Sequence, residues 1–248
     1  MFSHDKRKVY QKALASVARL AKHSVLWDKR HSVVDQLLRA SESIVLNIAE
    51  GARLRSGGNK QHLLDDAMGS ALECAACLDI GVVKHFLLPD LAAGEKRSLC
   101  EVVKMLMGLR SSWDNEPLRE EPAEYESRPD SGANVCLFPH ERLDVYQVGL
   151  ECMRWFHALP AGAELSSRLY RQVDKAVTSV ILNVAEGKGR YLDGDRRRFL
   201  DIAQGSAVKA AAYLDLCERN AELEPAQRQG GADLLGRIAL MTGVMSRG

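Results

Sequence analysis

Residues 43–58 read SIVLNIAEGARLRSGG, and residues 179–194 read SVILNVAEGKGRYLDG. The two stretches lie 136 positions apart, and each places an Asn, a Glu and a Gly at the end of an apolar run. Self-similarity at a fixed offset is the sequence signature of a repeated structural unit. The phrase therefore predicts that one fold occurs twice in this chain.

The same offset holds, without a gap, along most of the 248 residues. VYQ recurs at 9–11 and 145–147, and Pro89 matches Pro225. A run of small and acidic residues is also repeated: Leu64, Asp65, Ala67, Gly69, Ser70 and Ala71 recur as Leu200, Asp201, Ala203, Gly205, Ser206 and Ala207. We expect a duplicated domain, with copy 1 in residues 1–110 and copy 2 in residues 141–248.

Apolar residues in each copy recur at spacings of three and four, which is typical of amphipathic helices. In copy 1 they form four groups, at positions 9–20, 37–48, 64–78 and 99–109, and copy 2 repeats the pattern. No alternating strand pattern occurs, and no proline falls inside a predicted helix. Four helices with short loops close most easily as an up-down-up-down bundle. The predicted fold is all-α, with two antiparallel four-helix bundles in tandem.

Residues 111–140 differ from both copies in composition. They are rich in proline and carry a net charge of −5, against +5 for residues 1–110 and +1 for residues 141–248. An acidic segment without periodicity is typical of a linker. Its apolar residues could dock it on a bundle: Trp113, Tyr125, Leu137 and Phe138.

Composition and residue spacing argue against several classes of protein. The chain has no apolar segment of a signal peptide behind its N-terminal charges and no run of about 18 apolar residues, so we expect a cytoplasmic protein without a membrane partner. Cys74 and Cys77 form a CxxC, but copy 2 has Ala210 and Tyr213 there, which favours buried thiols over zinc or redox chemistry. The seven histidines show no ligand spacing, and we expect no metal, cofactor or small-molecule substrate.

The second predicted helix of each copy carries a polar stripe at spacings of four and three. Small and amide residues along it suit close helix contacts and hydrogen bonds that fix register. We interpret it as structural, with Gly51 ending the helix in a left-handed conformation and nearby cations offsetting the charge of Glu50. The predicted polar stripe comprises Gln36, Ser43, Asn47 and Glu50, and Gln172, Ser179, Asn183 and Glu186.

Basic residues cluster around the turn that follows this helix. Copy 2 interleaves Tyr191 and Phe199 with them, and a basic loop with aromatic residues is a signal of nucleic-acid binding. The alternative is a solvated loop or an intersubunit salt bridge. The candidate nucleic-acid-binding residues are Lys188, Arg190, Arg196, Arg197 and Arg198, with Arg53, Arg55 and Lys60 as a thinner counterpart in copy 1.

The pattern S-[IV]-x-x-N-[IV]-A-E-G, followed by a basic stretch and a Leu-Asp-x-Ala-x-Gly-Ser-Ala run, resembles the four-helix bundle family named for proteins encoded in 23S rRNA intervening sequences. The resemblance covers both copies. It implies antiparallel bundles, often assembled as rings of five, without established enzyme activity. Relatives include the accessory protein of diversity-generating retroelements, a basic ring that binds reverse transcriptase and nucleic acid. This chain departs from the family in being a fusion and nearly neutral.

Fusion limits the possible assemblies. Either the linkers join two five-membered rings, or the number of bundles in a ring is even, or the two copies pack only on each other. An intramolecular pair related by a pseudo-twofold axis is the simplest of these arrangements.

Three functions follow from these features. The first is a non-enzymatic module that binds RNA or a ribonucleoprotein through the basic loops. The second is a protein-binding scaffold, as a homo-oligomer or as an accessory subunit, for example of a reverse transcriptase. The third is an enzyme that uses Glu50 or Glu186 with Asp65 or Asp201, which the sequence disfavours because no nucleophile, base or metal ligand accompanies these carboxylates.

Overall fold

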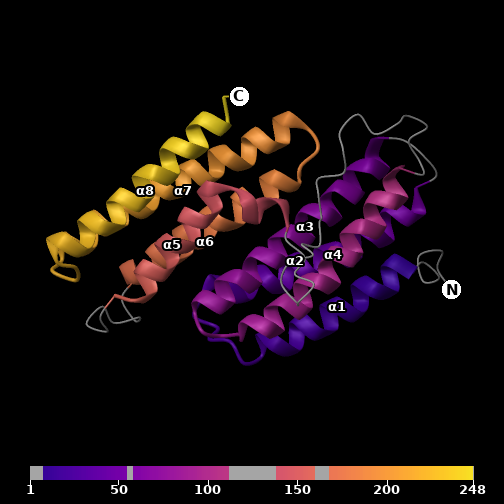
Figure 1. The fold of residues 1–248 in the computed structure, drawn as a ribbon, viewed down its shortest axis with the longest axis horizontal. Coiled ribbons are helices and arrows are strands. Elements are labelled where there is room, and N and C mark those ends of the chain that lie inside the picture. The colour runs from indigo at the N-terminus through magenta and orange to yellow at the C-terminus, as the bar shows by residue number, and fades with distance from the viewer. Residues whose placement is uncertain (1–7, 55–57, 112–137, 160–167, 248) are drawn as a thin grey trace, which may run out of the picture.

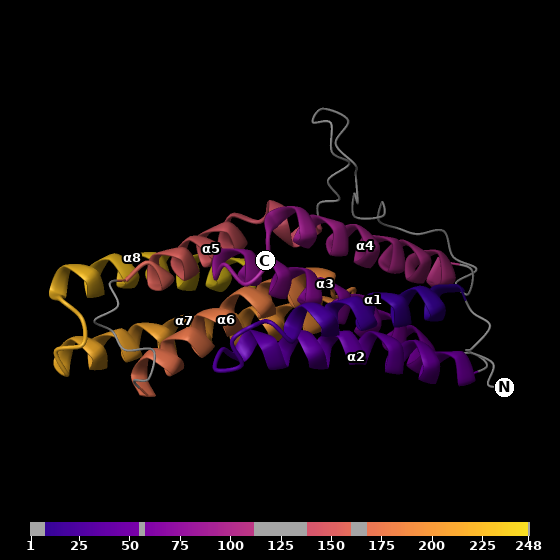
Figure 2. The same ribbon diagram turned by 90° about the horizontal axis from the view of Figure 1, so that it is seen from below.

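The computed structural model describes residues 8–54, 58–111, 138–159 and 168–247. This part contains eight α-helices, one short 3-10 helix and no strand. Two groups of four helices lie beside one another, offset along the long axis of the molecule (Figures 1 and 2). The elements are α1 Lys8–Ser24, α2 Ser32–Arg53, α3 Gly58–Val83, α4 Pro89–Ser111, η1 Pro139–Arg142, α5 Asp144–His157, α6 Arg168–Gly189, α7 Asp193–Arg219 and α8 Pro225–Met245.

Each group is an antiparallel four-helix bundle, as the sequence predicts. In copy 1, contacts run from α1 to α2, α2 to α3, α3 to α4 and α4 back to α1. Copy 2 repeats this closed circuit from α5 to α8. The apolar stripes of the four helices therefore meet in one core per bundle.

The residues at the helix ends explain where the helices begin, and one predicted helix end is wrong. Pro89 and Pro225 open the fourth helix of each bundle, where proline loses no hydrogen bond. Gly51 does not end its helix, because α2 continues to Arg53. At the equivalent Gly187, an added Cβ would lie 3.0 Å from the Cβ of Phe199, so glycine there allows α7 to approach α6 closely.

The left-handed residues predicted for the second helices occur after the third helices instead. His85 and Ala221, again 136 positions apart, have φ angles of 59° and 58°. In each copy the next N–H reaches back to a carbonyl of the last turn, from Phe86 to Gly81 and from Glu222 to Cys217, at 2.8 Å. This arrangement satisfies carbonyls that a helix end would otherwise expose.

Residues that are 136 positions apart occupy equivalent places in the two bundles. For one pair of contacting residues, both members differ between the two copies. In copy 1, Arg19 of α1 donates to Glu95 of α4 at 2.9 Å. Copy 2 has Trp155 and Gly231 at these positions, and the indole of Trp155 fills the space that Gly231 leaves. An ion pair in one copy is therefore replaced by aromatic packing in the other.

Helix α3 is covered on all sides. From Leu64 to Ile80 every residue is buried except Asp66, Glu73 and Asp79, which are partly buried. The equivalent helix α7 exposes one whole face. Since both helices face a bundle core in the same way, the additional burial of α3 comes from the neighbouring copy.

The two copies pack through a contact that is not twofold. Helix α3 lies against α6 and α5, and α2 also touches α6. A pseudo-twofold pair would require α2 to contact α7 as extensively as α3 contacts α6, and among the described residues it does not. The twofold expectation is therefore wrong: the contact is heterologous, with the third helix of copy 1 docked on the first and second helices of copy 2.

Most of the predicted linker, including Trp113, Tyr125 and Leu137, lies outside the described residues. Its last part precedes α5, where Phe138 and His140 are fully buried. The aromatic ring of His140 lies edge-on to Tyr146, with ring centroids 4.6 Å apart. The end of this segment therefore packs against copy 2. The domain boundaries at 110 and 141 remain a prediction.

Two glycines of α8 give a matched test of this packing. A Cβ on Gly231 would overlap Trp155 and lie 2.6 Å from Leu214 Cδ1, whereas one on Gly236 meets nothing within 4 Å. We expect Gly231→Ala to lower the free energy of unfolding by about 1–3 kcal/mol through overpacking. Gly236→Ala should raise it by up to about 1 kcal/mol through helix propensity. Urea unfolding measures both, and equal effects would contradict the packing.

Candidate functional site

The α6–α7 turn, taken together with the last residues of α6 and the first turn of α7, carries most of the predicted basic residues, and Arg190 is set apart from the others. Its guanidinium donates to Asp66 of α3 and to Glu186 one turn earlier on α6. Only 12% of the Arg190 side chain is exposed. Burial opposes its charge, but the two carboxylates outweigh burial and raise the pKa of Arg190. This residue joins copy 2 to copy 1.

The other cations of the turn face solvent. Lys188, Arg197 and Arg198 are exposed and make no ion pair within the described part of the chain. Arg196 is 41% exposed and lies 2.9 Å from Asp193. A single turn thus presents three unpaired cations and a fourth that is paired only at the surface.

An aromatic ring accompanies these cations. Tyr191 is 50% exposed. The guanidinium of Arg110, at the end of α4, lies 3.8 Å from the centroid of the Tyr191 ring, which is within the range of a cation–π contact. Arg110 also pairs with Asp65 of α3 at 2.8 Å. The turn is therefore positioned against copy 1, with the tyrosine at its edge.

The counterpart in copy 1 is weaker. Arg53 is exposed, but Lys60 is 92% buried and has a partner, and Arg55 lies outside the described residues. The structure therefore does not place a second cluster of exposed cations at this turn among the described residues.

The polar stripe makes the same hydrogen bonds in both copies. In copy 1, Asn47 Nδ2 donates to the carbonyl of Ser43 at 2.9 Å and to its Oγ at 3.0 Å, and the hydroxyl of Ser70 donates to Ser43 Oγ at 2.8 Å. In copy 2, Asn183 reaches Ser179 at 2.7 and 3.1 Å, and Ser179 meets Ser206 at 2.9 Å. The Ser–Ser bond links the second and third helices of each bundle, and the Asn–Ser bonds lie within the second helix.

The remaining stripe residues have different surroundings in the two copies. Gln172 accepts a hydrogen bond from Tyr213 at 3.3 Å, whereas Glu50 is exposed. A polar hollow of about 280 Å³ lies over the copy 1 stripe and is bordered on its other side by copy 2. Its lining includes Gln36, Ser43 and Asn47 from α2, Asp66, Ser70 and Glu73 from α3, Glu186 from α6 and Arg190 just after α6.

Glu73 is the residue of this hollow with the most altered ionisation. Burial, together with the charge of Glu186, raises its pKa to about 7. The carboxyl group of Glu73 is therefore protonated in slightly acidic solution and ionised in slightly basic solution. The free energy of unfolding therefore depends on pH over this range.

A buried ionic cluster that sequence reasoning missed joins the two copies. Lys84, just after α3, donates to Asp174 of α6, and His31 Nδ1 lies 3.2 Å from the same carboxylate. All three side chains are at least 95% buried. Burial works against the charge of Asp174, but His31 and Lys84 outweigh it and lower its pKa.

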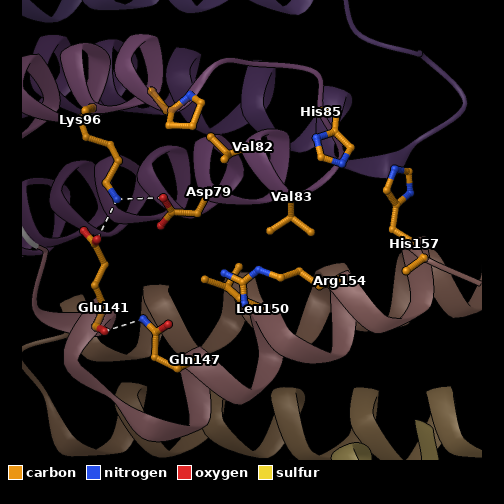
Figure 3. A pocket seen from close by; sticks show the side chains of 14 residues that line it. Asp79, Val82, Val83, His85, Lys96, Glu141, Gln147, Leu150, Arg154 and His157 are labelled. Atoms are coloured by element: carbon orange, nitrogen blue, oxygen red, sulfur yellow. Dashed lines mark hydrogen bonds and ion pairs between the residues drawn. The ribbon is translucent and has the colours of Figure 1, made fainter. Parts of the chain in front are cut away.

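A larger pocket of about 810 Å³ lies between the bundles (Figure 3). At one end Lys96 Nζ bridges Asp79 and Glu141, at 2.8 Å from each, and the Tyr146 hydroxyl donates to Asp79 at 2.8 Å. At the other end His85 and His157 face each other, with ring centroids 6.0 Å apart. Between the two ends the walls are largely apolar, with Val82, Val83 and Leu150.

The polar end of the pocket contains a possible ligand set for a metal. Side-chain atoms of Asp79, His140 and Glu141 lie within 4.8 Å of one another. The Lys96 ammonium already occupies a position between both carboxylates, and a divalent cation would have to displace this buried charge. Burial opposes the charge of Lys96, but Asp79 and Glu141 outweigh burial and raise its pKa. The arrangement therefore favours a structural ion pair.

Comparison with known proteins identifies the repeated unit. The family described as 23S rRNA-intervening sequence protein matches residues 5–108 and, separately, residues 141–242. No curated protein and no solved structure matches this chain. Within the described residues, none of the helices has the length and apolar character needed to cross a membrane.

The buried cluster predicts strong coupling between Lys84 and Asp174. Asp174→Leu leaves the Lys84 ammonium buried without a carboxylate, which should cost about 3–5 kcal/mol of unfolding free energy. Lys84→Asn combined with Asp174→Leu installs the residues found at the equivalent positions, Asn220 and Leu38, and should recover at least half of that loss. Urea unfolding of both single variants and the double variant gives the coupling. Additive effects would show that the two charges do not interact.

The raised pKa of Glu73 predicts a stability that depends on pH. The folded carboxyl holds its proton to about pH 7, whereas the unfolded one loses it near pH 4.5, so stability falls as pH rises between these values. Glu73→Gln should raise stability by roughly 2 kcal/mol at pH 8 and change it little at pH 5. Thermal melts at both pH values test this. The solvent-exposed Glu101→Gln is the control, and a gain for Glu73→Gln that is the same at both pH values would contradict the assignment.

Proposed function

The chain belongs to the family of 23S rRNA-intervening sequence proteins, and on this basis we propose that it is a non-enzymatic RNA-binding module. The binding surface is the turn between α6 and α7 of copy 2. Its ligand is structured RNA, alone or within a ribonucleoprotein.

The observation that carries this proposal is the group of unpaired cations at one turn. Exposed arginine and lysine side chains bind phosphates and release counterions, which supplies most of the affinity of a non-specific RNA contact. Lys188, Arg197 and Arg198 are available for such contacts, whereas Arg190 is held by two carboxylates. The exposed ring of Tyr191 offers a face on which an unpaired base can stack.

The proposal assigns one RNA site to each chain. The equivalent turn of copy 1 contributes Arg53, while Lys60 is turned into the protein. The two copies thus have different roles in this proposal. Copy 1 supports the turn through Asp66 and Arg110, and copy 2 presents the cations.

Two of the four carboxylates considered for catalysis have structural partners, which supports a non-enzymatic role, while the other two, Glu50 and Asp201, are exposed at the surface. Asp65 pairs with Arg110 at 2.8 Å, and Glu186 pairs with Arg190. Each of these contacts neutralises a partly buried charge. Burial outweighs these cations and raises the pKa of both carboxyl groups, but each group is engaged by an arginine guanidinium within the protein.

A gel-shift titration with a structured RNA tests the proposal. The triple variant Lys188→Ala/Arg197→Ala/Arg198→Ala should bind at least about tenfold more weakly at low salt. The slope of log affinity against log salt should fall by about 2 to 3, since each lost phosphate contact removes roughly one released ion.

The matched control removes three other exposed lysines from three different helices, Lys104, Lys175 and Lys209. It has the same net charge as the test variant and should keep most of the affinity. Equal losses in the two variants would mean that only the overall charge matters. Absence of RNA binding by the unmodified chain at low salt would refute the proposal and leave a protein-binding scaffold.

A further inference from the structure

The pocket between the bundles has the size and composition of a small-molecule site. Its volume of about 810 Å³ falls within the range of roughly 300–1,000 Å³ that is common for such sites, which also occur preferentially where two domains meet. Apolar side chains of α3, α4 and α5 form much of its wall, and polar groups lie at both ends (Figure 3). Apolar walls around an unfilled space gain packing contacts when an apolar group occupies it.

The repeated fold does not require these apolar walls. Residues 136 positions apart occupy equivalent places, and three apolar residues of the wall have charged counterparts in copy 2. Val82 and Val83 remain partly exposed inside the pocket, so packing between the copies does not fully cover them. The three pairs are Val82 and Glu218, Val83 and Arg219, and Ala92 and Arg228.

Three nitrogen-bearing side chains line the pocket away from the Lys96 ion pairs. Arg154 and His157 are three residues apart and share one face of α5. His85, which follows α3, faces His157 across the pocket (Figure 3). Within the described residues, none of the three side chains makes a hydrogen bond or an ion pair. Their N–H groups are therefore available to a ligand.

The repeated fold does not require these three side chains either. The counterparts of His85, Arg154 and His157 in the other copy are Ala221, Ala18 and Ala21. Ala221 takes the same left-handed backbone conformation as His85, with φ angles of 58° and 59°, so an imidazole is not needed to form that helix end. Three donors thus occur at the pocket where alanine serves the same bundle positions elsewhere.

The charge around the histidines favours an anion. Burial lowers the pKa of His157, and so do nearby basic groups. These groups are Lys84, His31 and His85, and the carboxylate of Asp174 offsets only part of their effect. An anionic group beside His157 would therefore meet a net positive charge.

The opposite end of the pocket determines how such a ligand lies. Asp79 and Glu141 share the single ammonium of Lys96, so carboxylates outnumber cations there. This end repels an anionic head group, and its carboxylates can accept a hydrogen bond from a hydroxyl or amino group of the ligand.

We propose that this pocket binds a small organic anion, with its carboxylate or phosphate group held by Arg154, His157 and His85 and its apolar body against Val82 and Val83. The ligand contacts both copies, because the arginine and one histidine belong to copy 2 and the other three residues to copy 1. No local sequence pattern predicts this site, since both copies contribute to it. The proposal holds whether or not the α6–α7 turn binds RNA.

Isothermal titration calorimetry tests the proposal with three probes that share one apolar chain: octanoate, octyl phosphate and the uncharged octanol. At least one anion should bind about tenfold or more tightly than octanol, because only the anions accept charge-assisted hydrogen bonds from Arg154. The anion that binds more tightly identifies the head group. Absence of binding by both anions at millimolar concentration would overturn the proposal, as would equal affinities for the anions and octanol.

The variant Arg154→Ala/His157→Ala installs the alanines of the other copy and removes two donors. It should bind the preferred anion at least about tenfold more weakly and leave the affinity for octanol unchanged. Lys104→Ala is the matched control: it also removes one positive charge, from an exposed residue of α4 that does not line the pocket, and should bind like the unmodified chain. Equal affinities of the double variant and the control for the anion would contradict the assignment.

A second variant tests the location of the apolar body. Ala93→Phe fills the pocket from α4 and should weaken the binding of all three probes. Circular dichroism melts check that it folds, and Ala158→Phe, on the α5 side of the pocket, replaces it if it does not. Undiminished binding of the anion by a folded pocket-filling variant would place the ligand elsewhere and overturn the proposal.

Discussion

The whole structure depends on covering helix α3 from two sides. Its sequence between Leu64 and Ile80 is so rich in small and apolar residues that one bundle cannot bury all of it. Copy 2 provides the second cover through α5 and α6. Two acidic residues of α3 at this boundary, Asp66 and Asp79, each meet a cation there, and the third, Glu73, has its pKa raised to about 7 by burial and by Glu186.

Duplication followed by divergence explains why the two halves now differ. The core of each bundle keeps the same helix order and the same Ser–Ser hydrogen bond, because this bond holds the second and third helices in register. The outer surfaces have changed in pairs. Copy 1 carries the partners that fix its neighbour, and copy 2 carries exposed cations at a turn that copy 1 supports. The repeated unit thus serves as a support in one position and carries the proposed binding surface in the other.

The sequence was sufficient to predict the bundles, since the repeated phrase and the helical spacing depend on local chemistry. It was not sufficient for the contact between the copies. The sequence pattern groups Arg190 with the other arginines near its turn, although a tertiary contact with Asp66 removes it from solvent. The motif predicts a helix end at Gly51, although α2 continues to Arg53, and only at the equivalent Gly187 does the next helix come so close that glycine is needed. The buried pair Lys84–Asp174 is detectable in the sequence in one respect. Both residues are charged, whereas the residues at the equivalent positions of the other copy, Asn220 and Leu38, are not.

The central claim, that α3 docks on α6 within one chain, is tested most directly by a disulfide between them. A Cβ built on Gly189 lies 3.6 Å from the Cα of Gly69, close enough for a bond between two cysteines. Oxidised Gly69→Cys/Gly189→Cys should show these two residues linked within a single chain when its peptides are mapped by mass spectrometry. The opposite docking would bring Arg53 and Gly205 together instead. A link within one chain of Arg53→Cys/Gly205→Cys, with none between residues 69 and 189, would contradict the account.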